Sequence, residues 1–240
     1  TGFVAPDDKT FAYLQGRRFV PQASDWDRAV ESWRQLRSDD GAVFDVEHVI
    51  DVSDLAPMIT WGTSPQHAVQ VQESVPSQAA SGASEEGYAR ALAYMDIQPG
   101  LPLLGLKIDA AFVGSCTNSR VSDLRRAAAV LAGRQVAPGV RAICVPGSMA
   151  VKRQAEAEGL DHIFKAAGFE WRESGCSMCF FAGGESFGAH ERVVSSTNRN
   201  FESRQGPETR THIASPETVV ASAIAGRIAD ARDLANLPVR

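Results

Sequence analysis

Apolar and polar residues follow different rhythms in the two halves of the chain. In the first half, apolar side chains recur mainly at helical spacing, as in Trp26, Ala29, Val30 and Trp33. From residue 106 onward, short uninterrupted apolar runs alternate with amphipathic stretches. This alternation predicts buried strands joined by helices, and therefore a mostly parallel sheet covered on both faces. The expected fold class is α/β, with three layers in the order α/β/α.

The apolar pattern also predicts the individual elements. In the first half we expect helices at 7–15 and 24–36 and one or two strands at 42–52, with the two tryptophans of the second helix in the core. A further helix is expected at 88–95. The second half predicts strands at 108–113, 140–145, 169–172, 192–196 and 212–214, and helices at 124–131, 149–158, 160–167 and 216–228.

Residues 74–87 are rich in Ser, Ala, Gly and Glu, and we interpret them as a linker. The expected organisation is then part of a preceding α/β domain at 1–73 and a second α/β domain at 88–240. Because the chain begins with Thr1 and its first residues read like the interior of a domain, we expect a fragment of a longer protein.

Composition narrows the class of function. The 240 residues are 44% hydrophobic and 22% charged, with a net charge of −5, which is ordinary for a globular protein. No basic block and no apolar run of about 18 residues occurs, so neither nucleic acid nor a membrane is an expected partner. No secretory signal opens the sequence, so its four cysteines indicate a reducing, cytoplasmic compartment rather than two disulfides.

Three of the four cysteines are placed where a parallel sheet binds ligands. Cys116 follows the strand predicted at 108–113, and Cys176 and Cys179 form a C-x-x-C pair after the strand at 169–172. Cys144 lies inside a predicted strand, and we interpret it as a small buried hydrophobe.

Spacing alone leaves several interpretations of these thiols open. They could hold an iron–sulfur cluster with one open position, a zinc ion, or a redox dithiol at the C-x-x-C pair, or they could be structural. A zinc ion would need a fourth ligand, for which His190 and His212 are candidates by position.

Two arginines lie in the loop that follows the strand at 192–196. Arg199 and Arg204 are five residues apart among Gly, Asn and Ser, and the guanidinium fork suits a carboxylate. Isolated arginines are usually solvated surface residues. Next to three cysteines at strand ends, however, they favour a site for a dicarboxylate or tricarboxylate.

Three separate segments now resemble the aconitase family of iron–sulfur hydro-lyases. They are Gly114-Ser115-Cys116-Thr117-Asn118-Ser119, Cys176-x-x-Cys179 and Asn198-Arg199-Asn200-Phe201-x-x-Arg204. Other segments are similar to the isopropylmalate dehydratase large subunits within that family, among them Thr60-Trp61-Gly62-Thr63-Ser64-Pro65 and Gly168-Phe169-Glu170-Trp171-Arg172. The resemblance covers essentially the whole chain and matches the later part of such subunits.

The resemblance implies one [4Fe-4S] cluster per subunit, held by Cys116, Cys176 and Cys179. It implies that substrate is bound by Arg199, Arg204, Asn198, Ser115 and Asn118. The implied reaction belongs to leucine biosynthesis and isomerises 2-isopropylmalate and 3-isopropylmalate by dehydration and rehydration. The implied partner is a small subunit, in a heterodimer, which carries the catalytic serine. The family's N-terminal region has no counterpart here, so the chain is expected to be incomplete as an enzyme, and none of its own residues is assigned a catalytic role.

Some local patterns depart from the family. Residues 180–184 read Phe-Phe-Ala-Gly-Gly where Leu-Ala-Met-Asn is usual, Ser203 replaces a usual Gly, and Pro207-Glu208-Thr209 interrupts a Gly-rich stretch. These differences keep two alternatives open. One is a dehydratase for a related 2-hydroxy acid of the homoaconitate or citramalate type, and the other is an inactive metal-binding fragment.

Overall fold

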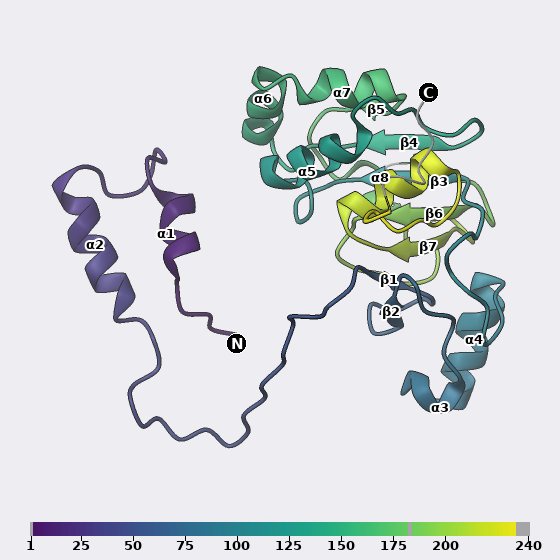
Figure 1. The fold of residues 1–240 in the computed structure, drawn as a ribbon, viewed down its shortest axis with the longest axis horizontal. Helices are drawn as coiled ribbons and strands as arrows, with labels where there is room; N and C mark the ends of the chain where they lie inside the picture. Colours follow the sequence, from purple (N-terminus) through teal and green to yellow (C-terminus); the bar gives the residue numbers. More distant parts are fainter. Residues whose placement is uncertain (1, 182–183, 234–240) are drawn as a thin grey trace. The chain divides into compact units, whose positions relative to one another are not determined.

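The computed structural model describes residues 2–181 and 184–233, and the chain divides into two compact units, 1–53 and 54–240 (Figure 1). Each unit is described separately below. The division falls earlier than the linker that we predicted at 74–87. Residues 54–73 belong to the second unit, where Ile59 forms a β-bridge with Ala214.

The first unit contains the two predicted helices, α1 (Asp8–Leu14) and α2 (Ser24–Arg34). The Asp7 carboxylate accepts a hydrogen bond from the Thr10 N–H and caps α1. Phe11 is buried and stacks on Trp33 at a centroid distance of 6.2 Å, while Trp26 meets Trp33 edge-on at 5.8 Å. The prediction that both tryptophans are core residues is wrong, since α2 has no buried residue: two short helices cannot enclose them.

The strands predicted at 42–52 are not formed. The apolar side chains of this segment are exposed: Val49 is 99% exposed and Val43 95%. Alternation predicts a strand only where a neighbouring strand can pair with it, and the described residues of the first unit supply none. Residues 2–53 therefore form helices and loops, and a preceding α/β domain at 1–73 stays a prediction.

The second unit is built on a five-stranded parallel sheet in the order β5-β4-β3-β6-β7 (Figure 1). The strands are β3 (Ala110–Val113), β4 (Arg141–Cys144), β5 (Glu170–Trp171), β6 (Arg192–Ser195) and β7 (Arg210–Ile213). All five were predicted, and the mostly parallel α/β class is confirmed. A small antiparallel pair, β1 (Met58–Thr60) and β2 (Ala68–Gln70), was missed because three-residue strands carry too little alternation to be recognised.

Four predicted helices cover one face of this sheet: α5 (Val121–Leu131), α6 (Met149–Ala157), α7 (Leu160–Ala167) and α8 (Pro216–Ala225). Ala111, Val113 and Cys144 belong to the core cluster beneath them. Pro216 opens α8 as expected, with the Ser215 hydroxyl accepting a hydrogen bond from the Thr218 N–H.

The opposite face is covered by connecting segments. The chain runs from β3 outward to β5 and then returns through β6 to β7 on the other side of β3. Right-handed connections place the described return segments, 172–181, 184–191 and 196–209, on the face that the helices leave free. Met178, Cys179 and Phe187 pack there against strand residues that include Phe112 and Ile143. The C-x-x-C pair therefore lies in the layer that covers this face.

The predicted linker is partly helical, with α3 (Gln78–Ser81) followed by α4 (Glu85–Met95). Helix α4 lies beside β7: the Tyr94 hydroxyl donates a hydrogen bond to the Thr209 carbonyl, and Arg192 donates one to the Met95 carbonyl. No helix among the described residues combines the length and the hydropathy that a membrane crossing requires.

Candidate metal and substrate site

The loops after β3 and β6 meet at the point where the strand order reverses, which is where open parallel sheets bind ligands. Ser196 joins them. Its hydroxyl accepts a hydrogen bond from the Gly114 N–H at 3.1 Å, and its carbonyl accepts one from the Asn118 amide at 2.7 Å. The segment that contains Ser115 and Cys116 is thereby fixed beside the segment that leads to Arg199.

Cys116 is exposed, in a setting that favours its thiolate. The Thr117 hydroxyl lies 3.6 Å from its sulfur, and this contact lowers the pKa of Cys116. The Ser115 hydroxyl and the positive charge of Arg204 act in the same direction, against the effect of partial burial. A thiolate is the form that binds metal.

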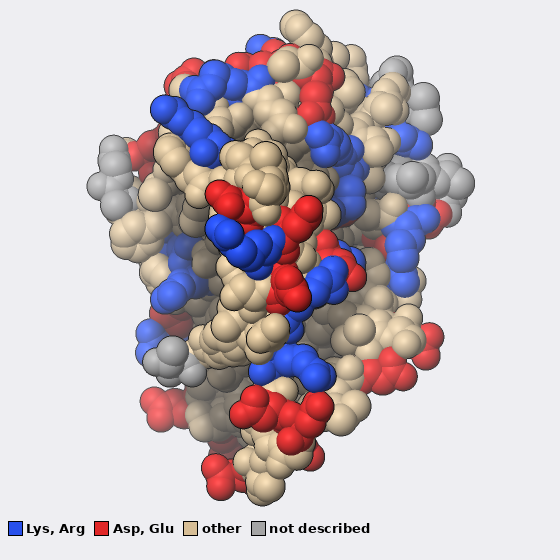
Figure 2. Space-filling view, turned by 90° about the vertical axis from the view of Figure 1, so that its left-hand side faces the viewer, with Lys and Arg blue, Asp and Glu red and all other residues tan. Residues whose placement is uncertain are grey.

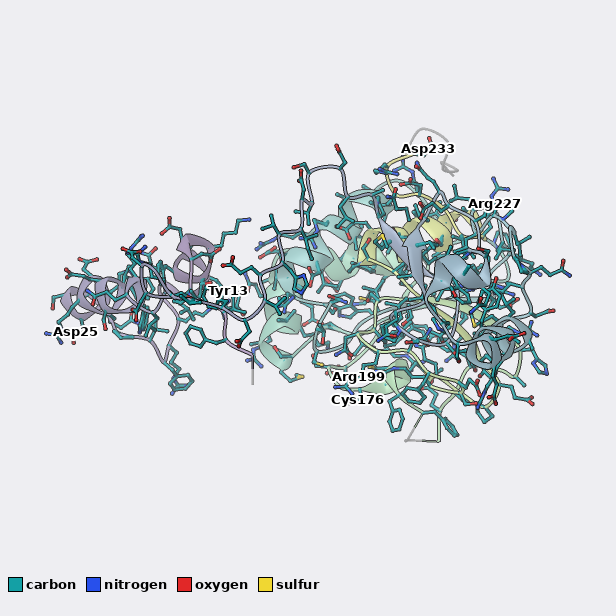
Figure 3. The ribbon with its side chains drawn as sticks, turned by 90° about the horizontal axis from the view of Figure 1, so that it is seen from below. Tyr13, Asp25, Cys176, Arg199, Arg227 and Asp233 are labelled. Atoms are coloured by element: carbon teal, nitrogen blue, oxygen red, sulfur yellow. The ribbon has the colours of Figure 1, made fainter. Side chains whose placement is uncertain are left out.

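Cys176 and Cys179 frame a single 3-10 turn, η1 (Ser177–Cys179), closed by a 2.9 Å hydrogen bond from the Cys179 N–H to the Cys176 carbonyl. Cys176 is exposed at the border of the second unit, and Cys179 is only 8% exposed (Figure 3). One thiol of the pair therefore faces solvent and the other faces the protein.

Two consecutive residues of the loop after β6 hold this turn. Arg204 donates from Nε to the Cys179 carbonyl at 2.8 Å and from Nη2 to the Cys179 sulfur at 3.3 Å. Gln205 donates to the Met178 carbonyl at 2.8 Å and accepts from the Thr211 hydroxyl of β7 at 3.0 Å. Gln205 was not predicted as a site residue, and only its position next to Arg204 could have suggested it.

Arg199 differs from Arg204. It is exposed, and within the described part of the chain its side chain has no hydrogen bond or ion pair. Figure 3 labels Arg199 and Cys176 at the same border of the second unit. Asn198 is exposed as well, whereas Asn200 is buried and donates to the carbonyls of Gly62 and Thr211. Asn200 therefore has a structural role.

A cleft of about 850 Å³ opens at the same edge of the sheet. Asn118 and Asn198 line it, together with apolar residues of β1 and the start of α8 such as Met58 and Pro216. None of the cysteines and neither predicted arginine lines it. The cleft therefore adjoins the cysteine site through the two asparagines without containing it.

The cysteine turn is also held from the side of β5. Arg172 donates to the Ser177 hydroxyl at 3.2 Å and pairs with Glu185 at 2.6 Å, and Arg141 reaches Glu185 at 3.1 Å. Figure 2 views the chain from another side and shows acidic and basic side chains interspersed over the face that is turned to the viewer. We interpret the ion pairs of Arg172 and Arg141 with Glu185 as support for the cysteine turn.

Neither histidine considered for zinc belongs to a group of three potential metal ligands among the described residues. His212 is fully buried between the Thr60 carbonyl at 2.7 Å and Arg192 at 2.8 Å; burial and the Arg192 charge lower its pKa to about 3. His190 is exposed beside Glu208. Cys144 is buried as predicted, and burial raises the pKa of its thiol.

Within residues 2–181 and 184–233, no three His, Cys, Asp or Glu side chains lie close enough to hold one metal ion. The three predicted cysteines therefore do not form such a group among the described residues. A [4Fe-4S] cluster makes a different demand, because each thiolate binds a separate iron at its own corner of the cube.

Comparison with known proteins defines the class. Residues 1–226 match the model of the aconitase family (aconitate hydratase), and the chain belongs to that family. Its members generally bind a [4Fe-4S] cluster. The parallel sheet with its cysteine-bearing loops is consistent with such a domain.

Individual relatives narrow the comparison. The chain is 64% identical over 234 residues to a 3-isopropylmalate dehydratase large subunit from Cupriavidus necator, covering 97% of this chain and 88% of that protein. It is 55% identical over 235 residues to large subunit 1 of that dehydratase from Bradyrhizobium diazoefficiens, covering 97% of this chain, and 53% identical over 233 residues to the large subunit from Roseiflexus castenholzii, covering 96%. It spans 49% of the length of each of these last two.

Proposed function

We propose that the chain is the cluster-binding part of a 3-isopropylmalate dehydratase large subunit. It would act in the cytoplasm as a heterodimer with a small subunit, isomerising 2-isopropylmalate and 3-isopropylmalate in leucine biosynthesis. Cys116, Cys176 and Cys179 are its proposed ligands for one [4Fe-4S] cluster. The names of the relatives and the family match support this proposal.

The observation that carries the proposal is the set of hydrogen bonds that joins three segments of the second unit. The Cys116 loop is hydrogen-bonded through Ser196 to the segment before Arg199, and Arg204 of the same loop contacts Cys179. The loop that contains Cys116 and the turn that contains Cys179 are thus both hydrogen-bonded to the segment that follows β6. A redox dithiol would need only the C-x-x-C pair and would leave these contacts without a role.

The donor set fits the cluster chemically. Cys116 has a lowered pKa, Cys179 receives a guanidinium hydrogen bond, and Cys176 is exposed to incoming metal. When bound, a cluster with three protein thiolates supplies an open iron that acts as a Lewis acid on a hydroxyl or carboxylate oxygen.

The remaining tasks fall to the residues of this chain. Arg199 presents its guanidinium to a substrate carboxylate, and Arg204 is close enough to the thiols to contribute positive charge there. Asn118 and Asn198 line the adjoining cleft, where an amide can orient a carboxylate or hydroxyl oxygen. Ser115 is buried, and its hydroxyl supports the Cys116 thiolate.

Anaerobic reconstitution with iron and sulfide tests the proposal. We expect the chain to gain bound iron, acid-labile sulfide and the visible absorbance of a thiolate-bound cluster. Cys176→Ser should abolish the gain, and Cys144→Ala, a change of the buried strand thiol, should not. Zinc without labile sulfide, or a gain that survives Cys176→Ser, would leave only a metal-binding or structural role.

A second candidate is a dehydratase for a related 2-hydroxy acid. The observation that favours it is aromatic: Phe180, Phe181 and Phe201 are 48%, 38% and 43% exposed beside Cys179 and Arg204, with the rings of Phe180 and Phe201 6.1 Å apart. Aromatic rings here would change the space for a substrate side chain. Assembled with the rest of the enzyme, Phe180→Leu should shift the ratio of kcat/KM between isopropylmalate and citramalate if this wall selects the substrate.

A further inference from the structure

Helix α4 contacts the loop after β6, although the helix carries none of the candidate site residues. The Tyr94 hydroxyl accepts a hydrogen bond from the Ser203 N–H at 2.7 Å and donates one to the Thr209 carbonyl at 2.9 Å. The stretch between these two loop residues is the one that is hydrogen-bonded to the cysteine turn. One side chain of α4 therefore holds both ends of that stretch.

A second contact comes from the preceding turn of the same helix face. Arg90 donates from Nε and Nη2 to the two carboxylate oxygens of Glu202, at 2.7 and 2.8 Å. The Arg90 side chain is 72% exposed, so this ion pair adds little to stability. Its two parallel hydrogen bonds instead fix the direction of Glu202, the neighbour of Ser203.

The backbone that α4 holds is in an unfavourable conformation. Ser203 has φ of 63° and Glu208 has φ of 58°, in the left-handed region that residues with a Cβ rarely adopt. The Ser203 hydroxyl accepts a hydrogen bond from the Glu208 N–H at 3.1 Å, which joins the two strained positions. Strained backbone persists where surrounding contacts determine it, and Tyr94 supplies such a contact at Ser203.

The strands on either side of the loop hold α4 in turn. Arg192 of β6 donates to the Met95 carbonyl at 2.9 Å, and Arg210 of β7 donates to the Tyr94 carbonyl at 3.2 Å and pairs with Asp96 at 3.2 Å. These cations satisfy carbonyls that the end of the helix leaves free, and they complement the helix dipole. The backbone of Tyr94 is thus fixed by the sheet, and its hydroxyl fixes the loop.

We propose that Tyr94 and Arg90 are positioning residues that set the conformation of residues 202–209 and thereby the position of the whole loop after β6. Neither side chain lines the cleft, so each acts through the loop. Because the loop also carries Asn198, which does line the cleft, a displaced loop weakens substrate binding. This effect on substrate rests on the proposed function, whereas the effect on the loop does not.

The first experiment needs neither cluster nor substrate. Amide hydrogen exchange of the metal-free chain is followed by mass spectrometry at constant pH and temperature. Tyr94→Phe, which removes only the hydroxyl, should accelerate exchange in residues 201–209 several-fold and leave residues 110–113 of β3 unchanged. Tyr88→Phe is the matched control, because it removes the same atom from the same helix but from a hydroxyl that donates to the Pro76 carbonyl.

The exposed ion pair gives a second variant that does not depend on the core. Arg90→Gln should accelerate exchange in residues 201–209 less than Tyr94→Phe does. Arg125→Gln should leave that exchange unchanged, since it removes an equivalent two-point ion pair with Glu158 that does not involve the loop. If faster exchange in β3 shows that Tyr94→Phe is unfolded, Arg90→Gln decides the question.

The second experiment uses the assembled, reconstituted enzyme. Tyr94→Phe should raise KM several-fold while bound iron and labile sulfide stay at the wild-type level, and Tyr88→Phe should change neither. A purely structural role would lower the amount of active enzyme, and with it the apparent kcat, at an unchanged KM.

Two outcomes would overturn the inference. One is wild-type exchange of residues 201–209 in folded Tyr94→Phe, or in Arg90→Gln where Tyr94→Phe is unfolded. The other is a wild-type KM in Tyr94→Phe. A wild-type chain that takes up no cluster refutes the proposed function instead, and hydrogen exchange still decides the role of α4.

Discussion

At the scale of single residues, the structure shows which polar groups serve the fold rather than the chemistry. His212 is an example: its ring bridges the Thr60 carbonyl and Arg192 inside the sheet. Burial first, and then the Arg192 charge, lower its pKa to about 3, so the folded protein holds the neutral imidazole. His212, which was a metal candidate by its position in the sequence, therefore has a structural role.

This predicts a dependence of stability on pH. In the unfolded chain a histidine has a pKa of about 6.5, so between pH 6.5 and 3 the unfolded state binds the additional proton. The free energy of unfolding should be highest above pH 6.5 and should fall by several kcal/mol as the pH approaches 3.

Chemical denaturation between pH 7 and pH 4 measures this slope. His212→Gln, which keeps polar atoms but does not titrate, should flatten it, whereas His162→Gln, at an exposed histidine of α7, should not. An equal slope in wild type and His212→Gln would contradict the assignment.

A second residue-scale prediction concerns Gly206, where the loop after β6 comes close to the connection between β5 and β6. Gly206 has φ near +150°, and a Cβ there would lie 2.6 Å from the Phe187 carbonyl oxygen. Gly206→Ala should therefore destabilise the second unit by roughly 2 kcal/mol. Gly175→Ala is the matched control, because a Cβ at that position meets open space. Thermal unfolding of both variants compares them directly.

At the scale of elements, burial decides which apolar patterns become structure. The segment 42–52 has the alternation of a strand, yet Ile50 is 79% exposed; Ile143 of β4 is fully buried. Ile143→Ala should cost about 2–5 kcal/mol. The same substitution at Ile50 should change the free energy of unfolding by less than about 0.5 kcal/mol. Equal losses in a urea titration would show that the segment is packed in solution.

The same contrast explains what could be predicted from the sequence. The strands and helices from residue 106 onward were predicted because uninterrupted apolar runs such as 110–113 are buried on both faces of a sheet. Strand β1 was missed because it is three residues long, and the segment 42–52 was predicted wrongly because alternation reveals nothing about the partner strand. A local pattern of apolar residues does not show whether a partner strand is available.

At the scale of the whole molecule, topology accounts for the site. The return of the chain from β5 to β6 places the C-x-x-C turn and the Arg204 loop on one face, and the order of strands places Cys116 beside Ser196. The position of Cys116 just after a strand could be predicted from the sequence, because it follows the apolar run 110–113. The hydrogen bonds from Arg204 to Cys179 could not be predicted, because they depend on side-chain direction and burial.

Because Cys116 lies after β3 and the C-x-x-C pair lies in the β5–β6 connection, a cluster bound to all three would link two loops that are far apart in sequence. A ligand that binds only the folded state stabilises it by mass action. A gain of roughly 3 kcal/mol would raise the Tm of the second unit by roughly 6–12 °C. Differential scanning calorimetry before and after anaerobic reconstitution measures the gain, and iron chelation should reverse it. Cys116→Ser should lose the stabilisation, whereas Cys144→Ala should keep the increment relative to its own metal-free form. If Cys116→Ser gains as much as wild type, iron is held by the C-x-x-C turn alone and does not link the two loops.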